Sequence, residues 1–132
     1  MIAVDTSALL HVAFAEPGYR DSVAVLLARS ARLVSAASVI KAQAVLASRA
    51  VEPRETLDRL MTLLRVEVVV VDDEHVEIAR DAYLTFGRAS GHPALQNFGD
   101  TFAYALARAR DVPLAYVGDD FSLTDLRLLR LA

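Results

Sequence analysis

The sequence contains no cysteine and no tryptophan, and its only lysine is Lys41. The absence of cysteine excludes disulfide scaffolds, thiolate metal sites and cysteine nucleophiles. The longest apolar run is far too short to span a bilayer, so we expect no membrane segment. The N-terminal stretch "MIAVDTSALL" has no basic region and reaches Asp5 early, so we expect no signal peptide and a cytoplasmic location.

Positive charge is also scarce. The 132 residues include 14 Lys and Arg against 17 Asp and Glu, which gives a net charge of −3. Proteins that hold nucleic acid by their own basic surface are usually far more positive. If this chain acts on nucleic acid, another group must help to neutralise phosphate, and a divalent cation is one candidate. Hydrophobic residues make up 55% of the chain, which suits one domain with a well-filled core and additional apolar surface for a partner.

Short apolar segments alternate with segments of helical periodicity. We expect strands over 1–5, 32–35, 66–72 and 113–119, and one turn of helix followed by a last short strand over 121–132. Helices are predicted over 6–15, 19–30, from Ser35 or Ser38 to about Arg49, and over 53–65, 72–88 and 100–111, with a loop over 89–99. Residues 66–72 are apolar on both faces, as in a parallel strand that helices cover on both sides. This pattern predicts an α/β sandwich with a mainly parallel sheet.

Acidic residues lie where the predicted strands end. Asp5 closes the first strand, Asp119 and Asp120 close the fourth, and Asp100 opens the preceding helix. Ligands of parallel sheets bind beyond the carboxyl ends of the strands, so these acids can meet at one edge. Converging carboxylates repel one another unless a cation lies among them. Oxygen ligands without His or Cys favour Mg²⁺ or Mn²⁺, which can activate water for attack on a phosphodiester.

Each acid also has a purely structural interpretation. Asp5 can cap the first helix. Asp100 stands three residues after Asn97, a spacing that resembles a capping arrangement. Asp119 and Asp120 can form a solvated turn. The residues alone leave both interpretations open.

The stretches "MIAVDTSALL", "VSAASVIKAQAVL", "GHPALQNFGDTFAYALAR" and "PLAYVGDDFSLTDL" resemble the PIN domain, specifically the VapC-type toxins of bacterial toxin–antitoxin pairs. The similarity extends in order along the chain, so it implies a single PIN domain over 1–132. The implied fold is a PIN-like α/β/α sandwich with a central, mainly parallel sheet of four to five short strands. Family members are metal-dependent endoribonucleases. The resemblance therefore implies hydrolysis of RNA, with tRNA or rRNA as candidate substrates and Mg²⁺ or Mn²⁺ as cofactor.

The resemblance also assigns roles to residues. Asp5 and Asp100 match the principal metal ligands, and Asp120 would complete the site. Asp119 is a weaker match, because that position often carries a non-acidic residue. By position, Thr6 and Ser7 would hydrogen-bond a carboxylate or phosphate.

Lys41 departs from the family pattern. The family has a further acid, normally Glu, in the helix after the small-residue turn, and counting along this sequence places Lys41 there. A unit charge and a dication about 5 Å apart interact by roughly 7 kcal/mol at an effective dielectric of 20, and a lysine turns that attraction into repulsion. We therefore predict weakened metal binding and weakened nuclease activity, with Lys41 paired to one of the aspartates. The alternative is an exposed lysine that points away from the site.

The resemblance implies a cognate VapB-type antitoxin, with homodimers and hetero-oligomers. The first two predicted helices carry more apolar residues than one sheet face needs, which suits an amphipathic antitoxin segment, although core burial explains each residue singly. These residues are Leu9, Leu10, Val12, Phe14, Val23, Leu26 and Leu27. An alternative function is a catalytically impaired PIN-fold module that mainly binds and sequesters its antitoxin. A phospho-acceptor receiver domain is a third candidate, but the order of its acids and lysine along the chain does not match.

Overall fold

The computed structural model describes residues 1–94 and 97–132, and in these residues five strands form one parallel sheet. The sheet order is β3-β2-β1-β4-β5, and each neighbouring pair is parallel. The strands are β1 (Ile2–Val4), β2 (Arg32–Ser35), β3 (Val66–Val69), β4 (Leu114–Tyr116) and β5 (Leu128–Arg130). All carboxyl ends therefore point to the same edge, as the predicted α/β architecture requires.

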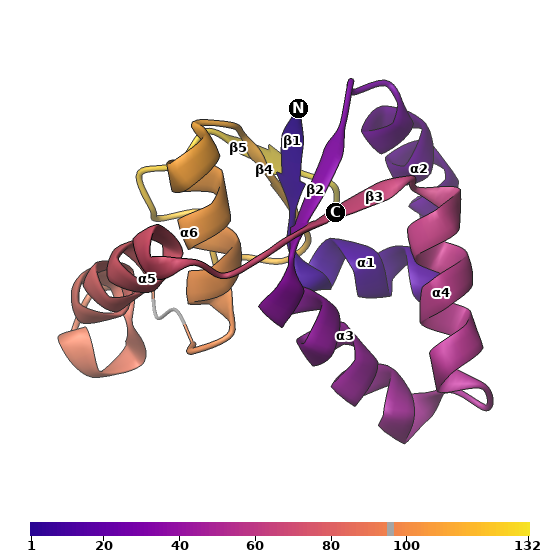
Figure 1. Ribbon diagram of the computed structural model, residues 1–132, viewed down its shortest axis with the longest axis horizontal. Helices are drawn as coiled ribbons and strands as arrows, with labels where there is room; N and C mark the ends of the chain where they lie inside the picture. Colours follow the sequence, from indigo (N-terminus) through magenta and orange to yellow (C-terminus); the bar gives the residue numbers. More distant parts are fainter. Residues whose placement is uncertain (95–96) are drawn as a thin grey trace.

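Helices cover both faces of this sheet (Figure 1). One layer contains α1 (Thr6–Ala13), α2 (Tyr19–Leu27), α3 (Ala36–Arg49) and α4 (Pro53–Leu63). The opposite layer contains α5 (Asp73–Phe86) and α6 (Asp100–Arg110), and a short 3₁₀ helix, η1 (Arg88–Ser90), follows α5. The predicted α/β/α sandwich with a parallel sheet of five short strands is thus the observed fold.

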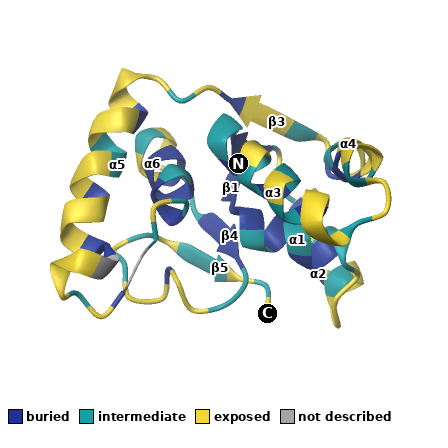
Figure 2. Cartoon of the chain, turned by 90° about the horizontal axis from the view of Figure 1, so that it is seen from below, coloured by how far each residue is buried: buried dark blue, intermediate teal, exposed yellow. Residues whose placement is uncertain are grey.

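Successive strand residues point to opposite layers, as the two-residue period of a strand requires. Ile2 and Val4 pack into the core under α1–α4. Ala3, Leu33 and Leu114 pack into the core under α5 and α6. Figure 2 shows β1 and β4 as buried and β3 as largely exposed. The two cores fix the central strands, and with them the edge where Asp5 stands.

Three local predictions are wrong. The strand over 66–72 was expected to be covered on both faces, but β3 stands at the edge of the sheet, and Val68 and Val70 are 49% and 70% exposed. β-Branched residues suit a strand whether or not both of its faces are covered, and within β3 only Val69 is buried. The fourth strand ends at Tyr116, before Asp119. Residues 121–126 form turns without a helix.

The predicted loop over 89–99 contains the end of η1 and a turn near Gly91. Its residues Leu95 and Gln96 lie outside the described residues. None of the described helices combines the length and the apolar character that crossing a membrane requires.

The apolar residues of the first two helices mainly fill the core. Leu9, Val12 and Leu26 are buried, and Leu10 and Phe14 pack partly buried against the same core. Core burial therefore explains these residues. Only Leu27 of this set, at 38% exposed, counts among the exposed large apolar side chains of the described residues.

Candidate metal centre

Asp5 directly follows β1 and occupies the N-cap of α1. Its Oδ2 accepts a hydrogen bond from the Ser7 N–H at 3.0 Å, so the capping interpretation is confirmed. Its Oδ1 is buried and has no hydrogen-bond partner among the described residues. Burial raises the pKa of Asp5, while hydrogen bonds from Ser7 and the charge of Lys41 oppose this shift. One carboxylate oxygen therefore holds the helix, and the other is free to bind a ligand.

Asp100, at the start of α6, also uses one carboxylate oxygen for a local hydrogen bond and turns the other toward Lys41. The Asn97 N–H donates to Asp100 Oδ2, and the Asp100 N–H donates to Asn97 Oδ1, both at 2.9 Å. This reciprocal pair has the hydrogen-bond pattern of a capping box and lies just ahead of α6, whose N-cap is Gly99. Burial first, and then the negative charges of Asp120 and Asp5, raise the pKa of Asp100 to about 7, against the opposing effects of Asn97 and Lys41. The negative charges of Asp5 and Asp120 therefore both reach Asp100.

Asp119 and Asp120 lie three and four residues beyond β4, and both are exposed. Asp119 Oδ1 forms an ion pair with Arg130 Nη2 at 3.1 Å, which directs it to the surface beside β5. Asp120 acts on Asp100 through its charge. Within residues 1–94 and 97–132, no group of three or more His, Asp and Glu side chains is arranged to hold a metal ion.

Thr6 and Ser7 connect the elements that carry these acids. Thr6 Oγ1 donates to the Ser38 carbonyl in α3 at 3.0 Å. Ser7 Oγ accepts from the Val117 N–H, just after β4, at 3.0 Å. The start of α1 is therefore tied both to α3 and to the segment that leads to Asp119 and Asp120.

Lys41 lies in α3 with its ammonium directed at this cluster. Its Nζ is 3.9 Å from Asp100 Oδ1, and its side chain is 37% exposed. The end of the side chain lies on Gly99, where an added Cβ would be only 2.6 Å from Nζ and 2.8 Å from Cδ. The alternative in which Lys41 points away from the site is wrong, and the predicted pairing with an aspartate is confirmed for Asp100.

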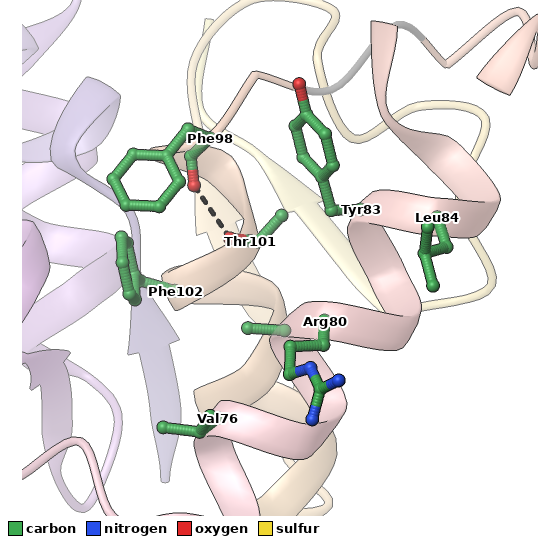
Figure 3. A pocket seen from close by; sticks show the side chains of 8 residues that line it. Val76, Arg80, Tyr83, Leu84, Phe98, Thr101 and Phe102 are labelled. Atoms are coloured by element: carbon green, nitrogen blue, oxygen red, sulfur yellow. Dashed lines mark hydrogen bonds between the residues drawn. The ribbon is translucent and has the colours of Figure 1, made fainter. Parts of the chain in front are cut away.

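The sequence did not indicate that Gly99 and Phe98, the exposed aromatic residue before it, lie beside the candidate site. Phe98 is 72% exposed and stacks edge-on with Phe102, with ring centroids 5.0 Å apart. These two rings line an apolar groove of about 550 Å³ beside Lys41, together with Ile40. They also border a second groove of about 470 Å³ between α5 and α6 (Figure 3). Helical periodicity in the sequence does not reveal Phe98 or Gly99, because both precede α6.

Carboxylate oxygens are donors that a hard dication prefers, although the described residues do not arrange three such side chains around one point. The centre offers carboxylate oxygens, one of which is buried without a partner at Asp5. At Asp100, burial first and then the neighbouring negative charges raise the pKa and make ionisation costly. A divalent cation relieves both conditions. In this chain the ammonium of Lys41 already supplies positive charge at Asp100.

Comparisons with known proteins agree with this description. The family model of the PIN domain matches residues 2–126. The chain is 37% identical over 125 residues to Ribonuclease VapC42 of Mycobacterium tuberculosis, covering 94% of this chain and 95% of that relative. It is 36% identical over 132 residues to Ribonuclease VapC30 of the same organism, covering 98% and 99%.

Solved structures share the fold at low identity. VapBC2 from Rickettsia felis, bound to a DNA fragment from its promoter, matches with a TM-score of 0.79 and 14% identity over 98% of each chain. VapC20 from Mycobacterium tuberculosis, described as a Sarcin-Ricin loop cleaving toxin, matches with a TM-score of 0.72 and 16% identity over 96% of each chain. With the family match, the relatives and the fold in agreement, the chain belongs to the PIN domain family and, within it, to the VapC ribonucleases.

Proposed function

We propose that this chain is the toxin of a toxin–antitoxin pair and an endoribonuclease that uses Mg²⁺ or Mn²⁺ to hydrolyse RNA phosphodiester bonds. In this form, Lys41 weakens the activity. The observation that carries the proposal is the Lys41 ammonium 3.9 Å from Asp100 Oδ1, in a cluster of acids at the carboxyl edge of the sheet. A cytoplasmic location is part of the same proposal.

Asp5 and Asp100 would hold the metal through the oxygens that do not cap helices. Asp120 would complete the site from its exposed turn, directly or through water. Asp119 is less suited, because it pairs with Arg130. When bound, the dication would neutralise phosphate charge and lower the pKa of a bound water. The bonds from Ser7 and Asn97 hold the two carboxylates so that each presents one oxygen to the site.

Lys41 acts against the metal in two ways. Its ammonium occupies the side of Asp100 that a dication would use. It also repels a dication, and a few kcal/mol of repulsion lowers metal affinity by orders of magnitude. The second candidate function, a PIN-fold module that mainly sequesters its antitoxin, follows if this contact abolishes cleavage altogether.

Metal-dependent cleavage of total RNA by this form and by Lys41→Glu tests the proposal. We expect Lys41→Glu to cleave RNA at least 10-fold faster than this form, because the substitution removes a few kcal/mol of repulsion toward the metal. A change of about 1.4 kcal/mol in the activation free energy already changes a rate tenfold. Cleavage should stop when metal is chelated. It should also stop in Lys41→Glu/Asp100→Asn, whose amide oxygen still accepts from the Asn97 N–H. No gain of cleavage in Lys41→Glu would contradict the proposal and favour the sequestering module, which predicts tight antitoxin binding without cleavage.

The proposed partners are a VapB-type antitoxin and a second copy of the toxin. Toxin–antitoxin complexes occur among the solved structures that share this fold. The exposed apolar side chains Ile40, Leu84 and Phe98 give this chain a surface of the kind that marks protein interaction sites.

A further inference from the structure

The segment 117–127 connects β4 to β5 and carries Asp119 and Asp120. It folds as turns and bends, without a helix or a strand of its own. The Ser122 N–H donates to the Asp119 carbonyl at 3.1 Å, which shapes a turn around Asp120 but fixes nothing outside it. The place of Asp120 in the molecule therefore depends on contacts that the segment makes with other elements.

Helix α6, which begins with Asp100, also holds the far end of this segment. The Tyr104 hydroxyl donates to Asp125 Oδ1 at 2.6 Å. Arg108 Nη1 lies 3.9 Å from Asp125 Oδ2, but both of these side chains are about half exposed, and exposed ion pairs contribute little. Asp100, Tyr104 and Arg108 follow one another at intervals of four residues, so they share one side of α6. The hydrogen bond from Tyr104 is therefore the specific contact between that side and the segment.

The hydroxyl of Tyr104 is not needed to pack the core. The Tyr104 ring is buried and lies against Phe86, with ring centroids 5.6 Å apart, and a phenylalanine would fill the same space. Burial first, and then the hydrogen bond and charge of Asp125, raise the pKa of Tyr104 against the opposing charge of Arg108. The hydroxyl therefore stays protonated, and its contribution to the fold is the bond that it donates to the segment.

A second contact holds the segment directly beside Asp120. Phe121, the next residue, is 1% exposed, and its ring packs against Tyr116 of β4 with centroids 5.5 Å apart. The segment is thus fixed at two points, Phe121 and Asp125, and a chain held at two points cannot pivot about either one. Asp120 itself is exposed, yet its charge reaches the buried Asp100. The contact from α6 therefore bears on where Asp120 lies relative to Asp100.

We propose that Tyr104 is a positioning residue of the candidate site, which holds Asp125 and thereby keeps the turn that carries Asp120 beside Asp100. This inference rests on the proposed function, in which Asp120 completes the site. In this role Tyr104 touches no substrate, because its hydroxyl acts only through Asp125. Catalysis is sensitive to such placement, since a shift of about 1 Å can lower a rate by roughly 100-fold. Loss of the hydroxyl should therefore impair RNA cleavage without impairing folding or RNA binding.

Steady-state cleavage of an RNA oligonucleotide in the Lys41→Glu background tests the inference. Tyr104→Phe and Asp125→Ala should each lower kcat by about 10-fold or more and leave KM unchanged. Asp125→Asn, whose amide oxygen still accepts from the Tyr104 hydroxyl, should retain kcat. The matched control is Tyr83→Phe on α5, which removes a hydroxyl from a tyrosine that is 38% exposed; it should change neither kcat nor KM.

Amide hydrogen exchange shows whether the hydroxyl acts by holding the segment. In Tyr104→Phe the Ser122 amide should exchange about 10-fold faster, because the segment opens more often, while the Ala3 amide in β1 should keep its protection. Unchanged exchange at Ser122, or an unchanged kcat in both Tyr104→Phe and Asp125→Ala, would overturn the inference and leave the proposed function intact. A folded Lys41→Glu protein that cleaves no RNA would overturn the proposed function and the inference with it.

Discussion

Asp5 and Asp100 each divide their two oxygens between a helix cap and the candidate site. Asp5 uses Oδ2 to cap α1, and Asp100 uses Oδ2 in its exchange with Asn97. The free oxygen of Asp5 is buried, and that of Asp100 faces Lys41. The structural and functional interpretations of these acids are therefore compatible. The capping bonds fix the orientation that a metal ligand needs.

Gly99 gives a residue-scale test of where Lys41 lies. Its backbone is helical, with φ −65° and ψ −32°, so the backbone conformation itself suits alanine. Gly99→Ala in a Lys41→Ala background should stabilise the protein by about 0.4–1 kcal/mol through the unfolded state. With Lys41 present, the new Cβ would displace the ammonium from Asp100. We therefore expect a coupling free energy of about 0.5 kcal/mol or more between Gly99→Ala and Lys41→Ala.

Urea unfolding of the four proteins in this double-mutant cycle measures the coupling. Equal effects of Gly99→Ala in both backgrounds would show that Lys41 does not lie on Gly99 in solution.

At the scale of elements, α3 has one face in the core and another in solvent. Leu46 is fully buried under the sheet, and Ile40 on the same helix is 70% exposed. Leu46→Ala should lower the free energy of unfolding by about 2–5 kcal/mol, because it leaves a cavity in a packed core. Ile40→Ala should change stability by no more than about 0.5 kcal/mol. Chemical denaturation checks both, and similar losses in the two variants would contradict this placement of α3.

The sequence predicted most elements because their periodicity is local. Pro53 marks the start of α4 as predicted. What failed depends on tertiary neighbours. The apolar run of β3 does not reveal that the strand lies at an edge, and "FSLTDL" resembles a helix turn but folds as turns before β5. Local spacing alone cannot tell these cases apart.

The sequence predicted only part of the candidate site. The positions of Asp5 and Asp100 follow from strand ends and cap spacing, which are local signals. The contact of Lys41 with Gly99 joins α3 to the start of α6, far apart in sequence.

At the scale of the whole molecule, an apolar patch crosses both helical layers beside the centre. Ile40 of α3, Phe98 and Leu84 of α5 are between 70% and 76% exposed. Large uncovered apolar patches promote association. We therefore propose that a second copy of the chain covers this patch.

Phe98→Ser tests this self-association. Loss of this large aromatic ring should shift the protein toward monomer in analytical ultracentrifugation. We expect the dissociation constant of self-association to rise by about 10-fold or more, because aromatic residues often dominate the binding energy of an interface. The control is Val51→Ser, a fully exposed apolar residue beyond the other end of α3. Unchanged self-association with loss of antitoxin binding would assign the patch to the antitoxin instead.

The most direct test of the central claim, that the Lys41 ammonium stands in for a dication among the acids, is calorimetric titration of Mn²⁺ into this form and into Lys41→Glu. We predict weak or undetectable binding to this form and clear one-site binding to Lys41→Glu, lost again when Asp100 is changed to Asn. Equally tight binding to both forms, or no binding to either, would contradict the account.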